Sequence, residues 1–323
     1  MAEADTRTLR GGEFLIRESA PEDVFTPEEL DEEAQMMAGV AGEFIEKEVL
    51  PKLEEIDKQE PGLVESLLDK AGEMGLFGTA IPEEYGGLGK DFNTNTAITL
   101  ALGPSHAFGV SIAAHTGIGT LPILYYGTEE QKKQYLPKLL TGELKAAYCL
   151  TEPGSGSDAL AAKSKAVLSE DGTHYVLNGQ KMWITNGGFA DVFTVFAQVV
   201  EGGKEHFSAF IVEAGSEGVT RGSEKRKMGI KGSSTTQIFF ENVKVPKENL
   251  LGEVGKGHKI AFNILNIGRL KLGASCVGGC KTVLGEATFY ADMFEGRRTA
   301  SGIPFRNNQM VAAHRAFPFG TIL

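Results

Sequence analysis

The sequence predicts an α+β protein in which a helical domain comes first, a β-domain follows and helices return at the end. Apolar residues recur at steps of three and four over residues 1–145, whereas short β-branched and aromatic runs fill residues 146–246. The helical period returns in residues 247–323. Because helices and strands do not alternate along the chain, a doubly wound parallel sheet is excluded, and we expect an antiparallel β-sandwich or barrel in the middle.

Four helices are expected in the N-terminal domain. Residues 26–29 have the features of a helix start, because Thr is followed by Pro and two Glu residues. Apolar spacing predicts two further helices, over residues 63–74 and, as a buried helix, over residues 97–114. Residues 128–131 have the spacing of a capping box and therefore begin another helix. Residues 81–89 are rich in Pro and Gly and are expected to form a loop.

Strands are expected in the middle domain at residues 175–178, 192–197, 207–212 and 237–245. Gly, Asn and Asp separate these runs, as they do in a small antiparallel sandwich or barrel. A long helix with an exposed apolar face is expected over residues 258–293.

Composition and charge exclude several classes of protein. The 323 residues are 41% hydrophobic and 23% charged, which is typical of a globular chain and not of a disordered one or a coiled coil. The net charge of −11 argues against nucleic-acid binding, because an acidic protein repels the phosphate backbone. We also expect no secretory signal peptide and no transmembrane segment, since no run reaches about 18–20 apolar residues.

Cysteine usage favours a reducing compartment, and we therefore expect a cytoplasmic protein. Cys149, Cys276 and Cys280 are too few for a disulfide framework. Cys276 and Cys280 lie one helical turn apart, but two thiolates without further ligands do not make a zinc site. No metal site is predicted, and the common nucleotide-binding and hydrolase motifs are absent from the sequence.

The most informative stretch is YCLTEPGSGSD at residues 148–158, where a strand runs into a Gly/Ser-rich turn. Such a turn presents successive backbone N–H groups and hydroxyls at close approach, which suits a pyrophosphate. A plain loop, in which Ser and Asp side chains cap the backbone, accounts for the same residues equally well. Both interpretations stay open on this stretch alone.

A second stretch, KMWITNG at residues 181–187, carries the only Trp of the chain. Trp183 stands at a strand end beside Thr185, so its indole is suited to pack against a planar heteroaromatic ring while the hydroxyl binds the edge of that ring. The alternative is that Trp183 fills the core of the β-domain, and taken alone this alternative is the stronger one.

Together the two stretches make the sequence resemble the acyl-CoA dehydrogenase family, most closely its very-long-chain branch. KMGIKGSSTTQIFFENVKVP at residues 227–246 and LGEVGKG at residues 251–257 extend the resemblance, which covers roughly residues 26–300 in order. It implies an N-terminal helical domain, a central β-domain and a C-terminal four-helix bundle, which is incomplete in this chain.

The resemblance also implies an activity. Members of this family are FAD-dependent oxidoreductases of fatty-acid β-oxidation, in which a Glu removes the α-proton of a fatty acyl-CoA and the β-hydride passes to the flavin, giving trans-2-enoyl-CoA. The implied electron acceptor is electron-transferring flavoprotein, and the intact family forms homo-oligomers.

Site residues are carried over by position. Thr151 is expected near the pyrimidine edge of the flavin, Trp183 beside the ring and Thr185 near N5, while Arg298 matches an arginine that reaches the FAD of a neighbouring subunit. Ser157, Asn266 and Arg269 are the expected acyl-CoA contacts, although the family often has Asp in place of Asn266. The full set of expected cofactor contacts is Tyr148, Cys149, Leu150, Thr151, Glu152, Pro153, Gly154, Ser155, Gly156, Ser157, Trp183, Ile184, Thr185 and Arg298.

No catalytic residue is assigned, because neither family position for the base holds a carboxylate. One branch carries its Glu just before the arginine matched by Arg269, where this chain has Gly268. In most members the Glu lies in a Glu-Gly-Thr-Asn-like stretch, and the 323 residues do not reach it. Ser301 replaces an expected aromatic residue, so we expect a truncation or frameshift near residues 300–305, an aberrant tail and impaired activity.

Two alternatives from other functional classes remain. The first is a non-catalytic fragment that binds flavin or acyl-CoA, and the second, disfavoured by the very-long-chain likeness, is a flavin monooxygenase or nitroalkane oxidase on the same scaffold. Gly119 also has two interpretations, because a small residue there leaves room for a long acyl tail or permits close helix packing.

Overall fold

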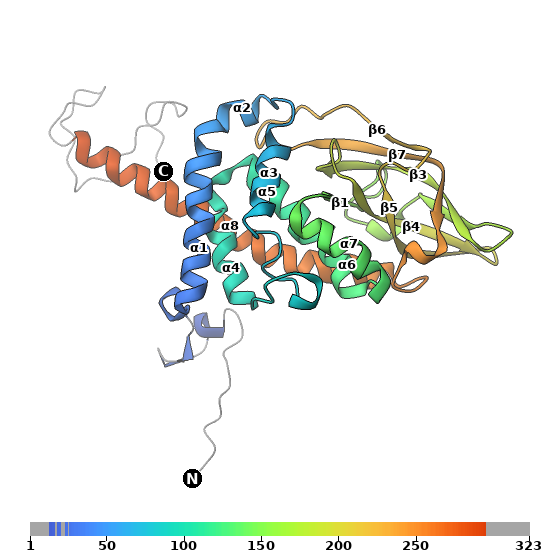
Figure 1. Ribbon diagram of the computed structural model, residues 1–323, viewed down its shortest axis with the longest axis horizontal. Coiled ribbons are helices and arrows are strands. Elements are labelled where there is room, and N and C mark those ends of the chain that lie inside the picture. The colour runs from blue at the N-terminus through green and yellow to red at the C-terminus, as the bar shows by residue number, and fades with distance from the viewer. Residues whose placement is uncertain (1–12, 17, 21–22, 25, 295–323) are drawn as a thin grey trace, which may run out of the picture.

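The computed structural model describes residues 13–16, 18–20, 23–24 and 26–294. Helices form one half of the molecule and a twisted sheet forms the other (Figure 1). The long helix α8 (Gly257–Phe294) starts at the sheet and runs past the helical half, where it contacts helix α4 (Phe92–Ala101). The predicted order of helices, strands and helices is confirmed.

Short helices and turns make up most of the helical half. The helical segments before the sheet are η1 (Glu13–Leu15), η3 (Pro27–Glu29), α1 (Glu32–Phe44), η4 (Ile45–Val49), η5 (Leu50–Lys52), α2 (Leu53–Asp57), α3 (Leu63–Glu73), η6 (Glu83–Tyr85), α4, η7 (Gly103–Ser105), α5 (Ala107–Ala113), η8 (Ala114–Gly119), α6 (Leu121–Tyr126) and α7 (Glu129–Thr141). The helix predicted over residues 63–74 is α3, and the loop predicted over residues 81–89 contains only the single turn η6.

One of the two helix starts predicted from capping residues is confirmed, and the other lies a few residues later than predicted. The backbone N–H of Thr128 donates to Gln131 Oε1 at 2.9 Å and that of Gln131 donates to Thr128 Oγ1 at 3.3 Å, which confirms the predicted capping box of α7. The start predicted at Thr26 is only the 3₁₀ turn η3. Helix α1 begins later, where Asp31 Oδ1 accepts the backbone N–H of Ala34 at 2.7 Å.

The single buried helix predicted over residues 97–114 is wrong. Helix α4 ends at Ala101 and α5 begins at Ala107, with the turn η7 between them. Pro104 has no N–H to donate to the helix, and its ring clashes with the preceding turn. The break also brings α8 close, because a Cβ on Gly103 would lie 2.4 Å from the carbonyl oxygen of Ser275.

The β-domain is an eight-stranded sheet with the order β6-β7-β3-β2-β4-β5-β8, and β1 pairs with β4 beside this path. The strands are β1 (Ala146–Cys149), β2 (Lys165–Leu168), β3 (His174–Thr185), β4 (Val192–Glu201), β5 (Lys204–Glu213), β6 (Val219–Arg221), β7 (Thr235–Pro246) and β8 (Leu250–Leu251). Most pairs are antiparallel as predicted, but β1 and β2 both pair with β4 in parallel.

This parallel pairing positions the Gly/Ser-rich stretch. Strand β1 pairs with residues 192–195 of β4, and β2 pairs with residues 198 and 199. The two strands therefore follow one another along the same edge of β4, and residues 150–164, which include the turn η9 (Ala159–Ala161), leave the sheet between them.

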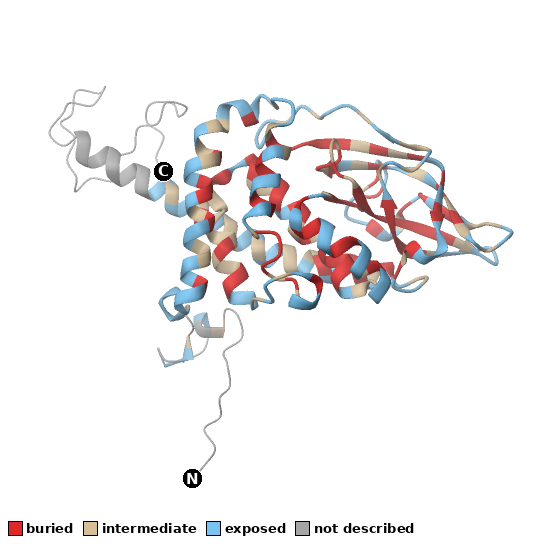
Figure 2. Cartoon of the chain, in the orientation of Figure 1, coloured by how far each residue is buried: buried red, intermediate tan, exposed pale blue. Residues whose placement is uncertain are grey.

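Buried side chains gather in the helical half, inside the sheet and where α6, α7 and the start of α8 meet the sheet (Figure 2). The exposed apolar face predicted for the last helix is present, since Leu270 and Leu272 on α8 are each 63% exposed. One described run, Ala107–Tyr126, is long and apolar enough to cross a membrane, contrary to the prediction from the sequence, and 72% of its apolar window is buried inside the protein.

Candidate functional site

The loop that leaves the sheet after β1 is held by its own backbone. The N–H of Glu152 donates to the carbonyl oxygen of Ser155 at 3.0 Å, and the N–H of Ser155 returns a bond to Glu152 at 3.1 Å. Ser155 Oγ donates to the carbonyl oxygen of Asp158 at 2.7 Å. Gly154 and Ser157 are exposed on this turn.

A buried ion pair joins this loop to the Trp-containing strand. Lys181 Nζ donates to Glu152 Oε1 at 2.7 Å and to the carbonyl oxygen of Leu150 at 3.2 Å, and the Lys181 side chain has no exposed surface. The N–H of Met182 donates to the carbonyl oxygen of Thr151 at 2.8 Å. The two stretches singled out in the sequence therefore form one unit.

Every oxygen of the Glu152 carboxylate is used inside the protein. Besides Lys181, it accepts the backbone N–H groups of Lys163 at 2.5 Å and Ser164 at 3.1 Å. Burial works against the ionised carboxylate, but Lys181 and these hydrogen bonds hold the pKa of Glu152 below its usual value. The side chain and the backbone N–H of Glu152 thus have partners inside the protein, and a flavin contact at Glu152 stays a prediction.

Trp183 projects away from the core. It has a left-handed φ of 62° at a bulge, where the pairing of β3 with β7 shifts between Lys181 and Ile184. The residue is 57% exposed. The alternative in which the indole fills the core of the β-domain is therefore wrong.

An apolar pocket of about 400 Å³ lies between α8 and the helices α5 and η8. Thr185, two residues after Trp183, reaches it from the end of β3, whereas Gly268 and Arg269 line it from α8. No Asp or Glu belongs to the residues that line this pocket. The described residues that line the pocket are Thr99, Leu102, His106, Gly109, Val110, Ile112, Ala113, Ala114, Thr116, Gly117, Ile118, Leu121, Thr185, Ile264, Leu265, Ile267, Gly268, Arg269, Lys271, Leu272 and Ser275.

The expected acyl-CoA contacts on α8 lie together at the surface. Arg269 Nη1 donates to Asn266 Oδ1 at 2.6 Å, and both residues are exposed. Ser157 is also exposed, on the loop after β1. Arg298 lies outside the residues that the structure describes.

Comparison with known protein families decides the assignment. The family profile for the N-terminal domain of acyl-CoA dehydrogenases matches residues 31–143, and the profile for their middle domain matches residues 147–243.

The chain belongs to the acyl-CoA dehydrogenase family.

Individual relatives agree with this assignment. A probable acyl-CoA dehydrogenase of Bacillus subtilis is 52% identical over 292 residues, which are 90% of this chain and 49% of that protein. The very long-chain specific mitochondrial enzyme of Rattus norvegicus is 44% identical over 80% of this chain and 40% of its own length. The chain thus spans about half the length of these curated relatives.

A solved structure shows the same fold. The crystal structure of an acyl-CoA dehydrogenase complexed with FAD from Bacillus anthracis superposes with a TM-score of 0.84 at 52% identity, covering 92% of this chain and 50% of that one.

Several residues expected to contact the cofactor in this acyl-CoA dehydrogenase chain are buried in the core. The Tyr148 hydroxyl donates to the carbonyl oxygen of Ala261 at 3.3 Å, and Cys149, Leu150 and Ile184 pack in hydrophobic clusters. Burial raises the pKa of the Cys149 thiol to about 12, so it is no nucleophile at neutral pH. The expected contacts that have exposed surface are Pro153, Gly154, Gly156, Ser157 and Trp183, while Thr151 and Thr185 are half-buried.

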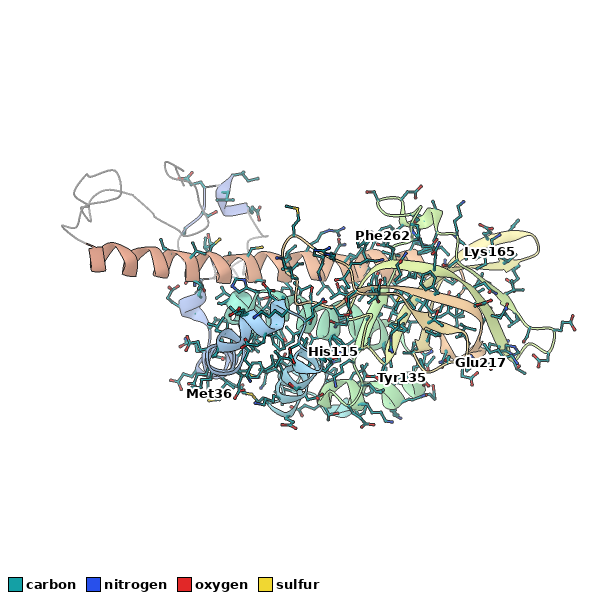
Figure 3. All side chains as sticks on the ribbon, turned by 90° about the horizontal axis from the view of Figure 1, so that it is seen from above. Met36, His115, Tyr135, Lys165, Glu217 and Phe262 are labelled. Atoms are coloured by element: carbon teal, nitrogen blue, oxygen red, sulfur yellow. The ribbon has the colours of Figure 1, made fainter. Side chains whose placement is uncertain are left out.

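His115 is a buried residue to which the sequence pattern gave no role (Figure 3). Its Nδ1 accepts the backbone N–H of Ala146 at 3.0 Å, and its Nε2 lies 2.9 Å from the carbonyl oxygen of Leu139, to which it donates. Burial lowers its pKa to about 4, so the ring is neutral. It ties η8 and α7 to the first strand, and a lone His in an apolar run carries no signal for such a link.

The two interpretations of Gly119 are also separated. A Cβ on Gly119 would lie 2.7 Å from the Cβ of Ala146, so this glycine permits close packing of η8 on β1. A Cβ on Gly117, which lines the pocket, would meet nothing within 4 Å. The space in the pocket therefore lies beside Gly117 and not beside Gly119.

Proposed function

We propose that this chain forms the flavin- and acyl-binding part of an FAD-dependent acyl-CoA dehydrogenase that converts fatty acyl-CoA thioesters to trans-2-enoyl-CoA in fatty-acid β-oxidation. One observation carries the proposal: a single apolar pocket takes Thr185 from the Trp-containing strand and Gly268 and Arg269 from α8. Two stretches about 80 residues apart in the sequence, both singled out by the family resemblance, thus meet at one cavity suited to an acyl chain.

The described residues fit a flavin. Trp183 is exposed at a bulge of β3, Thr185 lines the pocket, and Gly154 and Ser157 are exposed on the turn after β1. FAD bound here would supply the hydride acceptor. The Glu152–Lys181 pair sets the distance between these two segments, because it is anchored on both of them.

The pocket residues bind and orient the acyl chain. Apolar residues of the pocket wall, such as Ile118 and Leu265, exclude water from the alkyl tail. This burial of apolar surface is the main source of affinity for an alkyl chain. Asn266 and Arg269, held to each other at 2.6 Å on the exposed face of α8, are placed to meet the polar part of CoA.

The described residues that line the pocket include no carboxylate that could act as the general base. Gly268, at the position where one branch of the family carries its Glu, does line the pocket, and no Asp or Glu lines it with Gly268. A general base contributes roughly 10²- to 10⁴-fold in rate, so we expect slow turnover by this chain alone. The second candidate is accordingly a fragment that binds flavin or acyl-CoA without catalysis.

Partners and location belong to the same proposal. Electron-transferring flavoprotein is the expected electron acceptor, and the whole protein is expected to be a homo-oligomer. A cytoplasmic location is supported by three cysteines that are free in the structure, Cys149, Cys276 and Cys280.

The absorbance spectrum of the purified chain, recorded without oxygen before and after addition of palmitoyl-CoA, tests the proposal. A bound flavin spectrum that bleaches with substrate supports the dehydrogenase. A bound flavin that shifts but does not bleach supports the binding fragment. A chain that holds no flavin, even after incubation with excess FAD, contradicts the dehydrogenase, and one that in addition binds no palmitoyl-CoA in a calorimetric titration contradicts both candidates.

A further inference from the structure

Lys271 lies on the pocket wall, one helical turn beyond Gly268 on α8. It lines the 400 Å³ pocket and also a second, small cavity of about 30 Å³ on the side of the N-terminal helices. The residues that line both cavities are Thr99, Leu102, Ile112, Thr116 and Lys271. Lys271 therefore stands where the large pocket reaches the inside of the helical domain.

The ammonium group of Lys271 has no partner in the described part of the protein. No hydrogen bond or ion pair links it to another described residue, and neither cavity has an Asp or Glu in its wall. Burial alone lowers its pKa. Lys181, which is fully buried, has both a carboxylate and a carbonyl oxygen as partners. Lys271 is partly buried, and its ammonium group is free to form an ion pair with an anionic group that enters the pocket.

The hydroxyl groups beside Lys271 restrict which kind of ligand group can bind there. Thr99 Oγ1 donates to the carbonyl oxygen of Asn95 at 2.8 Å, and Thr116 Oγ1 donates to that of Ile112 at 2.9 Å. Their protons are thus already used, and their oxygens can only accept. Lys271 is the donor on this wall that carries a charge, which favours an anion over a hydroxyl or methyl end.

We propose that Lys271 binds a carboxylate at the far end of the acyl chain, so that the pocket accepts mono-CoA thioesters of dicarboxylic acids. This inference rests on the proposed function, because it requires the acyl chain of a CoA thioester to enter this pocket. The acyl chain runs along the apolar wall of α8, and the ω-carboxylate forms an ion pair with Lys271. A monocarboxylic chain of equal length fills the same space but leaves the ammonium group unpaired.

Calorimetric titration of the purified, FAD-incubated 323-residue chain with matched thioesters tests this site. The pairs are hexanoyl- and adipoyl-CoA, octanoyl- and suberoyl-CoA, and dodecanoyl- and dodecanedioyl-CoA. We expect the wild-type chain to prefer the dicarboxylic member of at least one pair. Lys271→Met should shift that preference by about 10- to 100-fold toward the monocarboxylic member, as expected for loss of a charged hydrogen bond. Lys271→Arg should retain it.

A matched control uses Lys281, an exposed lysine on the same helix beyond the pocket, whose Lys281→Met variant should leave every affinity unchanged. Equal effects of Lys271→Met on both members of every pair, or a wild-type preference for the monocarboxylic member at every length, overturn the site. If palmitoyl-CoA still bleaches the flavin in that case, the proposed function survives. If the wild-type chain binds no CoA thioester, both proposals fail.

Discussion

Two regions of this protein place a lysine in opposite surroundings. In the β-domain, Lys181 is locked to Glu152 at 2.7 Å and to a carbonyl oxygen, and the pair fastens the loop after β1 to the Trp-containing strand. On α8, Lys271 faces a pocket with no carboxylate in its wall. A buried charge with all its partners belongs to the scaffold, whereas a free ammonium group on the wall of a cavity is placed to bind a ligand. The charged groups on the β-domain side of the site thus have all their partners, whereas Lys271 on the α8 side has none among the described residues.

The largest expected effect comes from supplying the missing carboxylate on the α8 side. Gly268→Glu should raise the rate of flavin reduction by acyl-CoA by roughly 10²- to 10⁴-fold, because it places a general base in the pocket. A Cβ at this position would meet only Ile118 Cγ2, at 3.7 Å, which is an ordinary van der Waals contact. Stopped-flow absorbance without oxygen measures the rate. Gly268→Gln adds the same volume without a base, and equal rates for the two variants would contradict the prediction.

The role of the Glu152–Lys181 pair on the β-domain side is tested by removing one of its charges. Lys181→Met should lower the free energy of unfolding by about 3–5 kcal/mol, because it leaves the Glu152 carboxylate buried without its cation. Urea denaturation of the FAD-free chain measures the change. The double variant with Glu152→Leu should recover a large part of the loss, since no charge then remains buried. A double variant as unstable as the sum of the single ones would show that the pair is not the unit we describe.

His115 links the helical half to the sheet and gives a pH dependence. Its pKa is about 4 in the folded chain against a usual value of 6.5, so between these values only the unfolded chain takes up the proton. The stabilisation is complete above pH 6.5 and is lost as the pH falls toward 4, by roughly 3 kcal/mol. Denaturation midpoints across this range measure it. His115→Gln should flatten that part of the profile, and an unchanged slope would assign the effect to other groups.

The smallest effect on stability is expected at Trp183. Because the residue is 57% exposed, Trp183→Ala should change the free energy of unfolding of the FAD-free chain by less than about 1 kcal/mol. The same variant should weaken FAD binding, measured by fluorescence titration, because it removes the face on which the ring packs. Trp183→Phe keeps an aromatic face and should bind FAD more tightly than the Ala variant. A large loss of stability would contradict this prediction and would show that the Trp183 side chain stabilises the fold.

Much of the fold follows from local chemistry, and the errors have local causes too. The capping box at Thr128 and the strand that carries Trp183 were predictable because their signals lie within a few residues. The helix predicted across Pro104 is wrong because an apolar run does not form a continuous helix through a residue that lacks an N–H. The start predicted at Thr26 failed because Asp31, which follows within a few residues, caps the longer helix.

The sequence by itself determined the order of helices and strands, the family resemblance and the two stretches that frame the site, because periodicity and motif wording are local properties. Only the tertiary structure decided what each polar group does there. Lys181 receives Glu152 because β1 and β2 lie along the same edge of β4 and carry the loop back to β3, whereas Lys271 receives no described partner because α8 faces a cavity. Which distant residues contact one another depends on how the elements pack, and no single segment of the sequence determines that packing.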